Sequence, residues 1–174
     1  MTDIDTEIKS KVEHLLRRFG VEKPPVPVEQ LAKKLGVLLC PLPADEEISG
    51  ALVRKDGHVV IAVNPMHHSN RQRFTIAHEL GHFFFHSGIE EHVDKDFRVN
   101  WRRTADSPTA IDWEEVTANR FAAEFLMPTR LMKSDLDAIR AIDKRAVTLF
   151  ALRYKVSPEA MKIRLSNLGI VGPF

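Results

Sequence analysis

His78-Glu79-Leu80-Gly81-His82 is the stretch that most strongly constrains the fold and the chemistry of this chain. Two histidines four residues apart lie on one face of a helix, one turn from each other. Both imidazoles can therefore bind a single Zn²⁺ ion, and the glutamate beside them can reach a water molecule on that ion. The spacing predicts a helix that carries the centre of a zinc-dependent hydrolase, most often a peptidase, with Glu79 as the general base.

A catalytic zinc ion takes three protein ligands, so a third one is needed. His86 continues the four-residue spacing, but a helix rises about 12 Å between His78 and His86, which is too far for both rings to bind one ion. Glu115 is the better candidate, because it lies on a second predicted helix that ends before Pro128. Asn119 follows one turn later on the same face. We expect Glu115 to bind the metal and Asn119 to orient a ligand histidine.

Gly81 lies inside the predicted metal-binding helix, where a glycine costs about 1 kcal/mol relative to alanine. Because it has no Cβ atom, another backbone can approach it closely, and the helix that carries Glu115 is the expected neighbour. The alternative is a tolerated glycine without a role.

The remaining periodicity predicts an α+β fold. We expect the metal-binding helix to begin with Ser69 or Asn70 as its N-cap. We also expect a small sheet of about three strands, packed on helices that include the metal-binding helix. The expected helices are 4–19 and 28–35, and the expected strands are 37–40, 49–54 and 58–63, with the last two joined at Asp56-Gly57.

The C-terminal part is predicted to be helical. Helices near 129–136 and 139–154 precede Ser157, which is expected to cap a last helix, so that a helix-turn-helix outline results. We therefore divide the chain into a metallopeptidase core, 1–128, and a helical lobe packed on it, 129–174. The lobe holds nine Lys/Arg residues and four Asp/Glu residues. Direct DNA binding is thus an alternative, although an ordinary solvated helix face has the same composition.

Between 87 and 112 neither helical nor strand periodicity is present. A connection of this length between the two ligand helices is expected to border the metal site. Arg102 and Arg103 are candidates there for contacting substrate or stabilising an oxyanion. Further candidates are Tyr154, which is the only tyrosine, and the histidines at 67, 68 and 86. The alternatives are solvated loop arginines, surface turn histidines and a histidine that merely ends a helix.

Composition limits where the protein acts. Cys40 is the only cysteine, which excludes an internal disulfide and fits a reducing cytoplasm. We expect it to be buried packing. No apolar run approaches the roughly 18 residues of a membrane span, and the N-terminus has no signal-peptide pattern. A cytoplasmic protein without membrane association is expected.

The sequence around these residues resembles the ImmA/IrrE family of zinc peptidases. Two separated motifs in the same order are more specific than the zinc motif alone, and the resemblance covers about residues 27 to 169. The first motif is Phe74-Thr75-Ile76-Ala77-His78-Glu79-Leu80-Gly81-His82, preceded by Ile61-Ala62-Val63-Asn64 and Arg71-Gln72-Arg73. The second is Glu115-x-x-Ala118-Asn119-x-Phe121-Ala122-Ala123-x-x-Leu126-Met127-Pro128, and a third match lies around Val156-Ser157-Pro158-Glu159-Ala160-Met161.

This resemblance implies a zincin-like core in which His78, His82 and Glu115 hold the metal and Glu79 is the general base. Zn²⁺ is the expected metal, with Mn²⁺ as the alternative. Family members act in the bacterial cytoplasm, typically on a helix-turn-helix repressor encoded nearby. Cleaving or displacing it switches on mobile-element, toxin–antitoxin or stress genes. The chain is too short for the C-terminal sensor domain of longer members, so the short form is expected.

Two other functions remain open at this point. One is a regulator that binds a repressor or DNA without cutting, with the zinc site as a scaffold. The other is an amide hydrolase that acts on small molecules.

Overall fold

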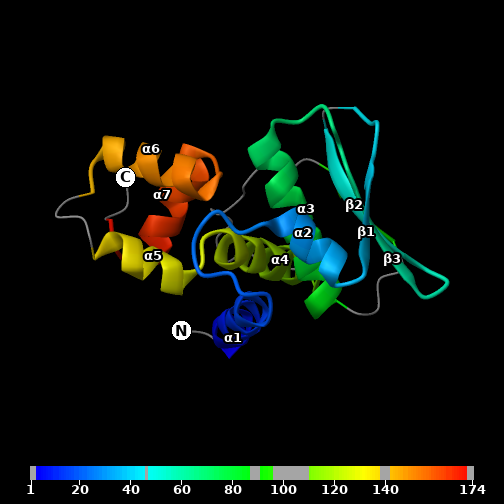
Figure 1. Ribbon diagram of the computed structural model, residues 1–174. Coiled ribbons are helices and arrows are strands. Elements are labelled where there is room, and N and C mark those ends of the chain that lie inside the picture. The colour runs from blue at the N-terminus through cyan, green and yellow to red at the C-terminus, as the bar shows by residue number, and fades with distance from the viewer. Residues whose placement is uncertain (1–2, 46, 87–90, 96–109, 138–141, 172–174) are drawn as a thin grey trace. The chain divides into compact units, whose positions relative to one another are not determined.

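The computed structural model describes residues 3–45, 47–86, 91–95, 110–137 and 142–171 (Figure 1). Within these ranges the chain is α+β, as the sequence predicts. The helices are α1 (Asp3–Arg18), α2 (Val28–Lys34), α3 (Ser69–Phe85), α4 (Ala110–Leu126), α5 (Thr129–Leu136), α6 (Lys144–Tyr154) and α7 (Pro158–Asn167). The strands are β1 (Val37–Pro41), β2 (Ile48–Lys55), β3 (His58–Val63) and β4 (Glu91–Lys95).

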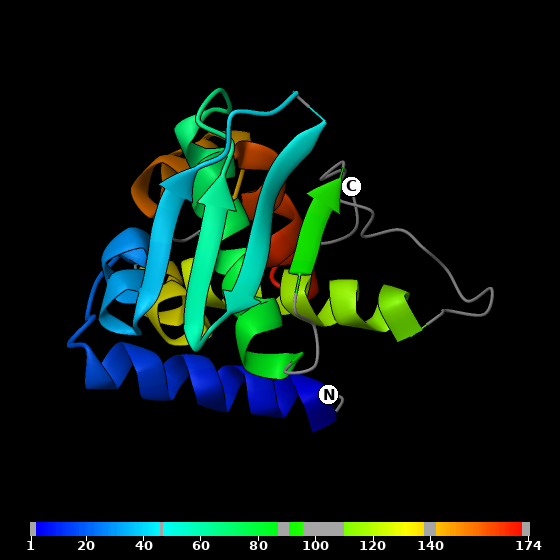
Figure 2. The same cartoon turned by 90° about the vertical axis from the view of Figure 1, so that its right-hand side faces the viewer.

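The strands form one mixed sheet in the order β1-β3-β2-β4, seen face-on in Figure 2. β1 runs parallel to β3, whereas β2 is antiparallel to β3 and to β4. The predicted hairpin turn is confirmed: Asp56 and Gly57 both have positive φ, 50° and 77°, as a two-residue primed turn requires.

β4 is a fourth strand that the sequence did not predict. Its residues, Glu-His-Val-Asp-Lys, include a single aliphatic side chain, so they lack the apolar alternation by which a half-buried strand is recognised. β4 is placed instead by backbone pairing, with Asp94 opposite Gly50 and Val93 opposite Ala51. Charged side chains are typical of strands at the edge of a sheet.

α3 packs on β2 and β3, and α2 packs on β1 and α3. The stretch of α3 from Arg73 to His82 is buried without interruption. Gly50 on β2 allows this close packing, because a Cβ atom there would lie 2.4 Å from Cγ2 of Thr75 and 2.7 Å from the carbonyl oxygen of Ala62. The absence of one side chain therefore sets the separation between the sheet and α3.

The N-cap of α3 is His68, not Ser69 or Asn70. Nδ1 of His68 accepts a hydrogen bond from the backbone N–H of Asn70, which satisfies one of the unpaired donors of the first turn. Histidine is not among the usual Ser, Thr, Asp and Asn caps, so the predicted helix start is one or two residues late.

The chain folds as two compact units. One comprises Val28–Ala122, with the sheet, α2, α3 and most of α4, and the other joins Met1–Pro27 to Ala123–Phe174. The division predicted from the sequence instead places the first helix with the core and separates the chain at 128. The reason for the difference is visible at Arg130, whose guanidinium contacts Glu13 of α1 at 3.2 Å and donates to the carbonyl of Val21.

Contacts of α7 and of the turn before it stabilise the unit that joins Met1–Pro27 to Ala123–Phe174. The guanidinium of Arg164 on α7 forms a buried ion pair with Glu124 and donates to the carbonyl oxygen of Met127. Between α6 and α7, Lys155 adopts a left-handed conformation with φ of 53°. The hydroxyl of Ser157 accepts from the backbone N–H of Ala160 as the predicted N-cap. The helix-turn-helix outline is therefore present.

The predictions for Cys40 and for membrane-spanning helices have different outcomes. Cys40 is exposed on β1 and is not the buried packing residue that the sequence suggested, because it lies on a strand at the edge of the sheet. None of the helices in the described ranges has the length and hydropathy needed to cross a bilayer.

Candidate metal centre

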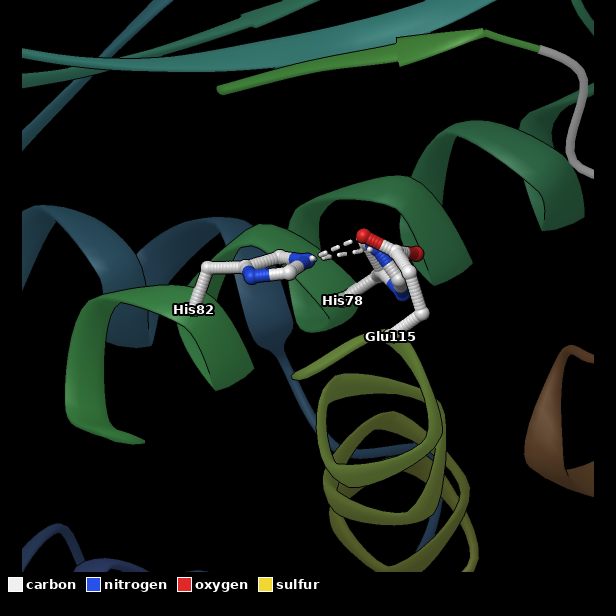
Figure 3. A group of neighbouring side chains, drawn as sticks. All are labelled: His78, His82 and Glu115. Atoms are coloured by element: carbon white, nitrogen blue, oxygen red, sulfur yellow. Dashed lines mark hydrogen bonds and ion pairs between the residues drawn. The ribbon is translucent and has the colours of Figure 1, made fainter. Parts of the chain in front are cut away.

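The three side chains that the sequence predicts as metal ligands meet between α3 and α4 (Figure 3). His78 and His82 are completely buried, and the side chain of Glu115 is 34% exposed. The Nε2 atoms of the two histidines lie 3.0 Å apart. Oε2 of Glu115 lies 3.4 Å from Nε2 of His78, and its Oε1 lies 3.3 Å from Nε2 of His82.

Gly81 determines how closely the two helices approach. A Cβ atom on Gly81 would lie 2.8 Å from Cα of Ala118, 3.0 Å from its carbonyl oxygen and 3.2 Å from its Cβ. Ala118 follows Glu115 by about one turn of α4, so the contact places Glu115 opposite the two histidines. The close helix approach that the sequence predicts at this glycine is confirmed.

The donor set fits a divalent metal ion. Tetrahedral zinc with metal–ligand distances near 2.0–2.1 Å places its ligand atoms about 3.3 Å apart. The two Nε2 atoms lie 3.0 Å apart, and each lies 3.3 or 3.4 Å from a different oxygen of the Glu115 carboxylate. Two imidazole nitrogens and one carboxylate are also a set that catalytic zinc uses, with the fourth position left open.

Asn119 determines which nitrogen of His78 can bind a cation. Oδ1 of Asn119 lies 3.0 Å from Nδ1 of His78. A carbonyl oxygen only accepts, so Nδ1 of His78 carries the proton and Nε2 retains its lone pair. That lone pair points at the cluster formed with His82 and Glu115. The orienting role of Asn119 stays a prediction, and this contact is the one that the role needs.

Glu79 and Arg54 lie next to this cluster. Glu79 is completely buried on α3. Nη2 of Arg54, on β2, donates to the carbonyl oxygens of His82 at 2.9 Å and Phe83 at 3.3 Å. Desolvation lowers the pKa of Arg54, and the nearby carboxylate of Glu79 partly offsets this by raising it. A cation thus stabilises the C-terminal turn of α3 beside the predicted general base.

Sequence reasoning missed Arg54, because an arginine near the end of a strand is usually a solvated side chain. Alternation does place it on the same face of β2 as Leu52 and Gly50. An arginine that continues the buried face of a strand could have been recognised as a residue that turns toward the interior.

The other candidates for oxyanion or substrate contact have different outcomes. The hydroxyl of Tyr154 is buried and donates to Oδ2 of Asp135. Burial, and then this hydrogen bond, raises the pKa of Tyr154, and the hydroxyl is therefore not available as an oxyanion donor. Arg102 and Arg103 lie outside the described residues. His86 ends α3, with its Nδ1 3.0 Å from Nδ1 of His82, on the side of that ring away from the cluster.

Two known proteins resemble this chain, one in sequence and one in fold. A Bacillus phage phi105 protein named uncharacterized immunity region protein 2 is 28% identical over 123 residues, which are 71% of this chain and 70% of that protein. A solved Mycobacterium tuberculosis transcriptional regulator has a similar fold, with a TM-score of 0.60, 18% identity and 95% of this chain covered. The chain spans 47% of the length of that regulator.

The family comparison covers most of the chain, and it includes both helices of the metal centre. The model of the IrrE N-terminal-like domain matches residues 32–166. The chain therefore belongs to the IrrE N-terminal-like family of peptidases.

Proposed function

We propose that this protein is a zinc-dependent endopeptidase of the bacterial cytoplasm that cleaves a helix-turn-helix transcriptional repressor. The observation that carries the proposal is that His78 and His82 on α3 meet Glu115 on α4. A buried glutamate, Glu79, follows His78 directly on α3. The family match supports peptide hydrolysis. The phage relative, named for an immunity region, supports a repressor as the target.

When bound, Zn²⁺ lowers the pKa of its water toward about 7 and polarises the scissile carbonyl group. His78, His82 and Glu115 would hold it, and Mn²⁺ is the alternative ion. The carboxylate of Glu79 accepts the proton of the attacking water and transfers it to the leaving amine. Asn119 keeps the proton of His78 on Nδ1. Burial of Glu79 and both histidines limits the access of bulk water to these atoms, which strengthens their electrostatic interactions.

In a helix-turn-helix protein the second helix enters a groove of DNA, and here that helix is α7. The charges of α7 give little support to direct DNA binding. α7 carries two cations, Lys162 and Arg164. Arg164 is buried in its ion pair with Glu124, and Glu159 is exposed in the first turn. A first turn with a carboxylate repels the phosphate backbone. We therefore propose that the C-terminal lobe, 129–174, holds the protein substrate rather than DNA, and that catalysis belongs to the unit Val28–Ala122, which carries His78, His82 and Glu115.

The test mixes the purified protein, loaded with Zn²⁺ or Mn²⁺, with the helix-turn-helix repressor encoded beside its gene. Mass spectrometry is expected to show one discrete cut. Glu79→Gln should bind the metal normally and lose about 100-fold or more of the cleavage rate, whereas Glu115→Ala should bind the metal more weakly.

Glu114→Gln is the matched control, because it makes the same chemical change on α4 beside the ligand and should cut normally. Equal cleavage by wild type and Glu79→Gln would refute the mechanism. An intact repressor in a stable complex with the protein would favour the regulator that binds without cutting.

A further inference from the structure

The two histidine ligands differ in the group that holds the far side of their rings. Nδ1 of His78 donates to an amide oxygen, that of Asn119. Nδ1 of His82 instead lies 3.0 Å from Nδ1 of another imidazole, that of His86. The usual partners of a ligand histidine are carboxylates, backbone carbonyls or water. The imidazole of His86 therefore occupies a position where a hydrogen-bond acceptor is expected.

One proton lies between the two rings. A separation of 3.0 Å between Nδ1 atoms is a hydrogen-bond distance, so one nitrogen is protonated and the other presents its lone pair. If His82 carries that proton, its Nε2 has a lone pair directed at His78 and Glu115. If His86 carries it, neutral His82 must hold its own proton on Nε2, facing the cluster. Only the first arrangement is compatible with metal binding.

The backbone holds His86 in place for this contact. The N–H of His86 donates to the carbonyl oxygen of His82, and the two ring centroids lie 4.9 Å apart. The guanidinium of Arg54 donates to that same carbonyl oxygen. The end of α3 is therefore tied back to residue 82 through both the main chain and the ring of His86.

We infer that His86 is a positioning residue that accepts the Nδ1 proton of His82 and thereby keeps the Nε2 lone pair of His82 available to the metal. This inference rests on the proposed metal centre, and it gives His86 a different role from ligand or substrate contact. His86 and Asn119 would then perform the same task for the two histidine ligands.

The test compares zinc affinity in three variants, by competition with a chromophoric chelator. His86→Leu removes the acceptor and should lower the affinity about 10- to 100-fold, as loss of such partners typically does. His86→Asn places an amide oxygen near the former Nδ1, as Asn119 does for His78, and should stay within about threefold of wild type. His14→Leu, an exposed histidine on α1, is the matched control and should bind zinc normally.

Nitrogen NMR of the zinc-loaded proteins gives a second readout that does not depend on activity. In wild type, Nδ1 of His82 should carry a proton that is hydrogen-bonded to Nδ1 of His86, and this hydrogen bond should be absent in His86→Leu. A wild-type protein in which Nδ1 of His82 makes no hydrogen bond to His86 would overturn the inference, and so would normal zinc affinity in His86→Leu. If wild type binds no zinc, the proposed metal centre itself fails. If both His86 variants lose affinity equally, His86 does not act as an acceptor.

Discussion

Replacing Gly81 by alanine tests the packing that brings the ligand helices together. The new Cβ would lie 2.8 Å from Cα of Ala118, whereas carbon atoms pack best at about 3.5–4.0 Å. The two helices must therefore separate by about 0.7 Å or more. Removing the Ala118 side chain cannot relieve this contact, because two of the three close atoms belong to the backbone.

Two effects on stability oppose each other in Gly81→Ala. Alanine gains about 1 kcal/mol in helix propensity, and overpacking costs about 1–3 kcal/mol, so the net loss of unfolding free energy should be at most about 2 kcal/mol. The zinc affinity should fall as well. Metal–ligand distances tolerate about 0.2 Å, and Glu115 moves with the backbone of Ala118. We expect a loss of about 10- to 100-fold in zinc affinity.

The assay combines urea unfolding with zinc competition. Thr117→Ala is the control, since it raises the helix propensity of α4 and removes only a hydrogen bond to the carbonyl of Trp113. It should leave zinc affinity unchanged. A Gly81→Ala protein with increased stability and unchanged zinc affinity would refute the packing argument.

Three further predictions concern other parts of the chain. Arg164→Met leaves the buried carboxylate of Glu124 without its ion-pair partner, and unfolding in urea should show a loss of about 3–5 kcal/mol; a loss below about 1 kcal/mol would contradict this. The raised pKa of Tyr154 means that its contribution to stability is complete below its unfolded pKa of about 10 and is lost as pH rises above that value. Wild type should therefore lose stability above about pH 10, and Tyr154→Phe should lose less; because this is the only tyrosine, phenolate absorbance reports its titration directly. Arg54→Gln removes the charge beside Glu79 and the guanidinium donor to the carbonyls of His82 and Phe83; repressor cleavage should fall more than about 10-fold with the fold retained, and unchanged cleavage would count against a role for Arg54.

Most of the metal centre could be predicted because its spacing is local. The interval from His78 to His82 is fixed by the helix itself, and Glu115 and Asn119 share a face of α4 for the same reason. Gly81 indicated the close approach of the two helices, because a glycine inside a helix is costly without a packing reason. These features need no knowledge of the tertiary structure.

The features that were missed depend on tertiary contacts. β4 is held by backbone pairing with β2. Backbone pairing does not require apolar side chains, so the sequence of β4 has no apolar alternation. Arg54 acquires its position only when β2 packs against the end of α3. The partner of Tyr154, Asp135, lies on a different helix. None of these contacts has a fixed sequence spacing, so periodicity could not reveal them.

The glycine at position 50 has a consequence for recognising related proteins. Gly50 on β2 leaves room for the side chain of Thr75 on α3, and Gly81 on α3 leaves room for the backbone of α4 at Ala118. We therefore expect a sequence that keeps both histidines, Glu79 and Glu115 to hold these side chains less well together if either glycine acquires a Cβ atom. An inventory of functional side chains would count such a protein as active. Glycine at both positions, in addition to the histidine motif, is thus the pattern to look for in related sequences.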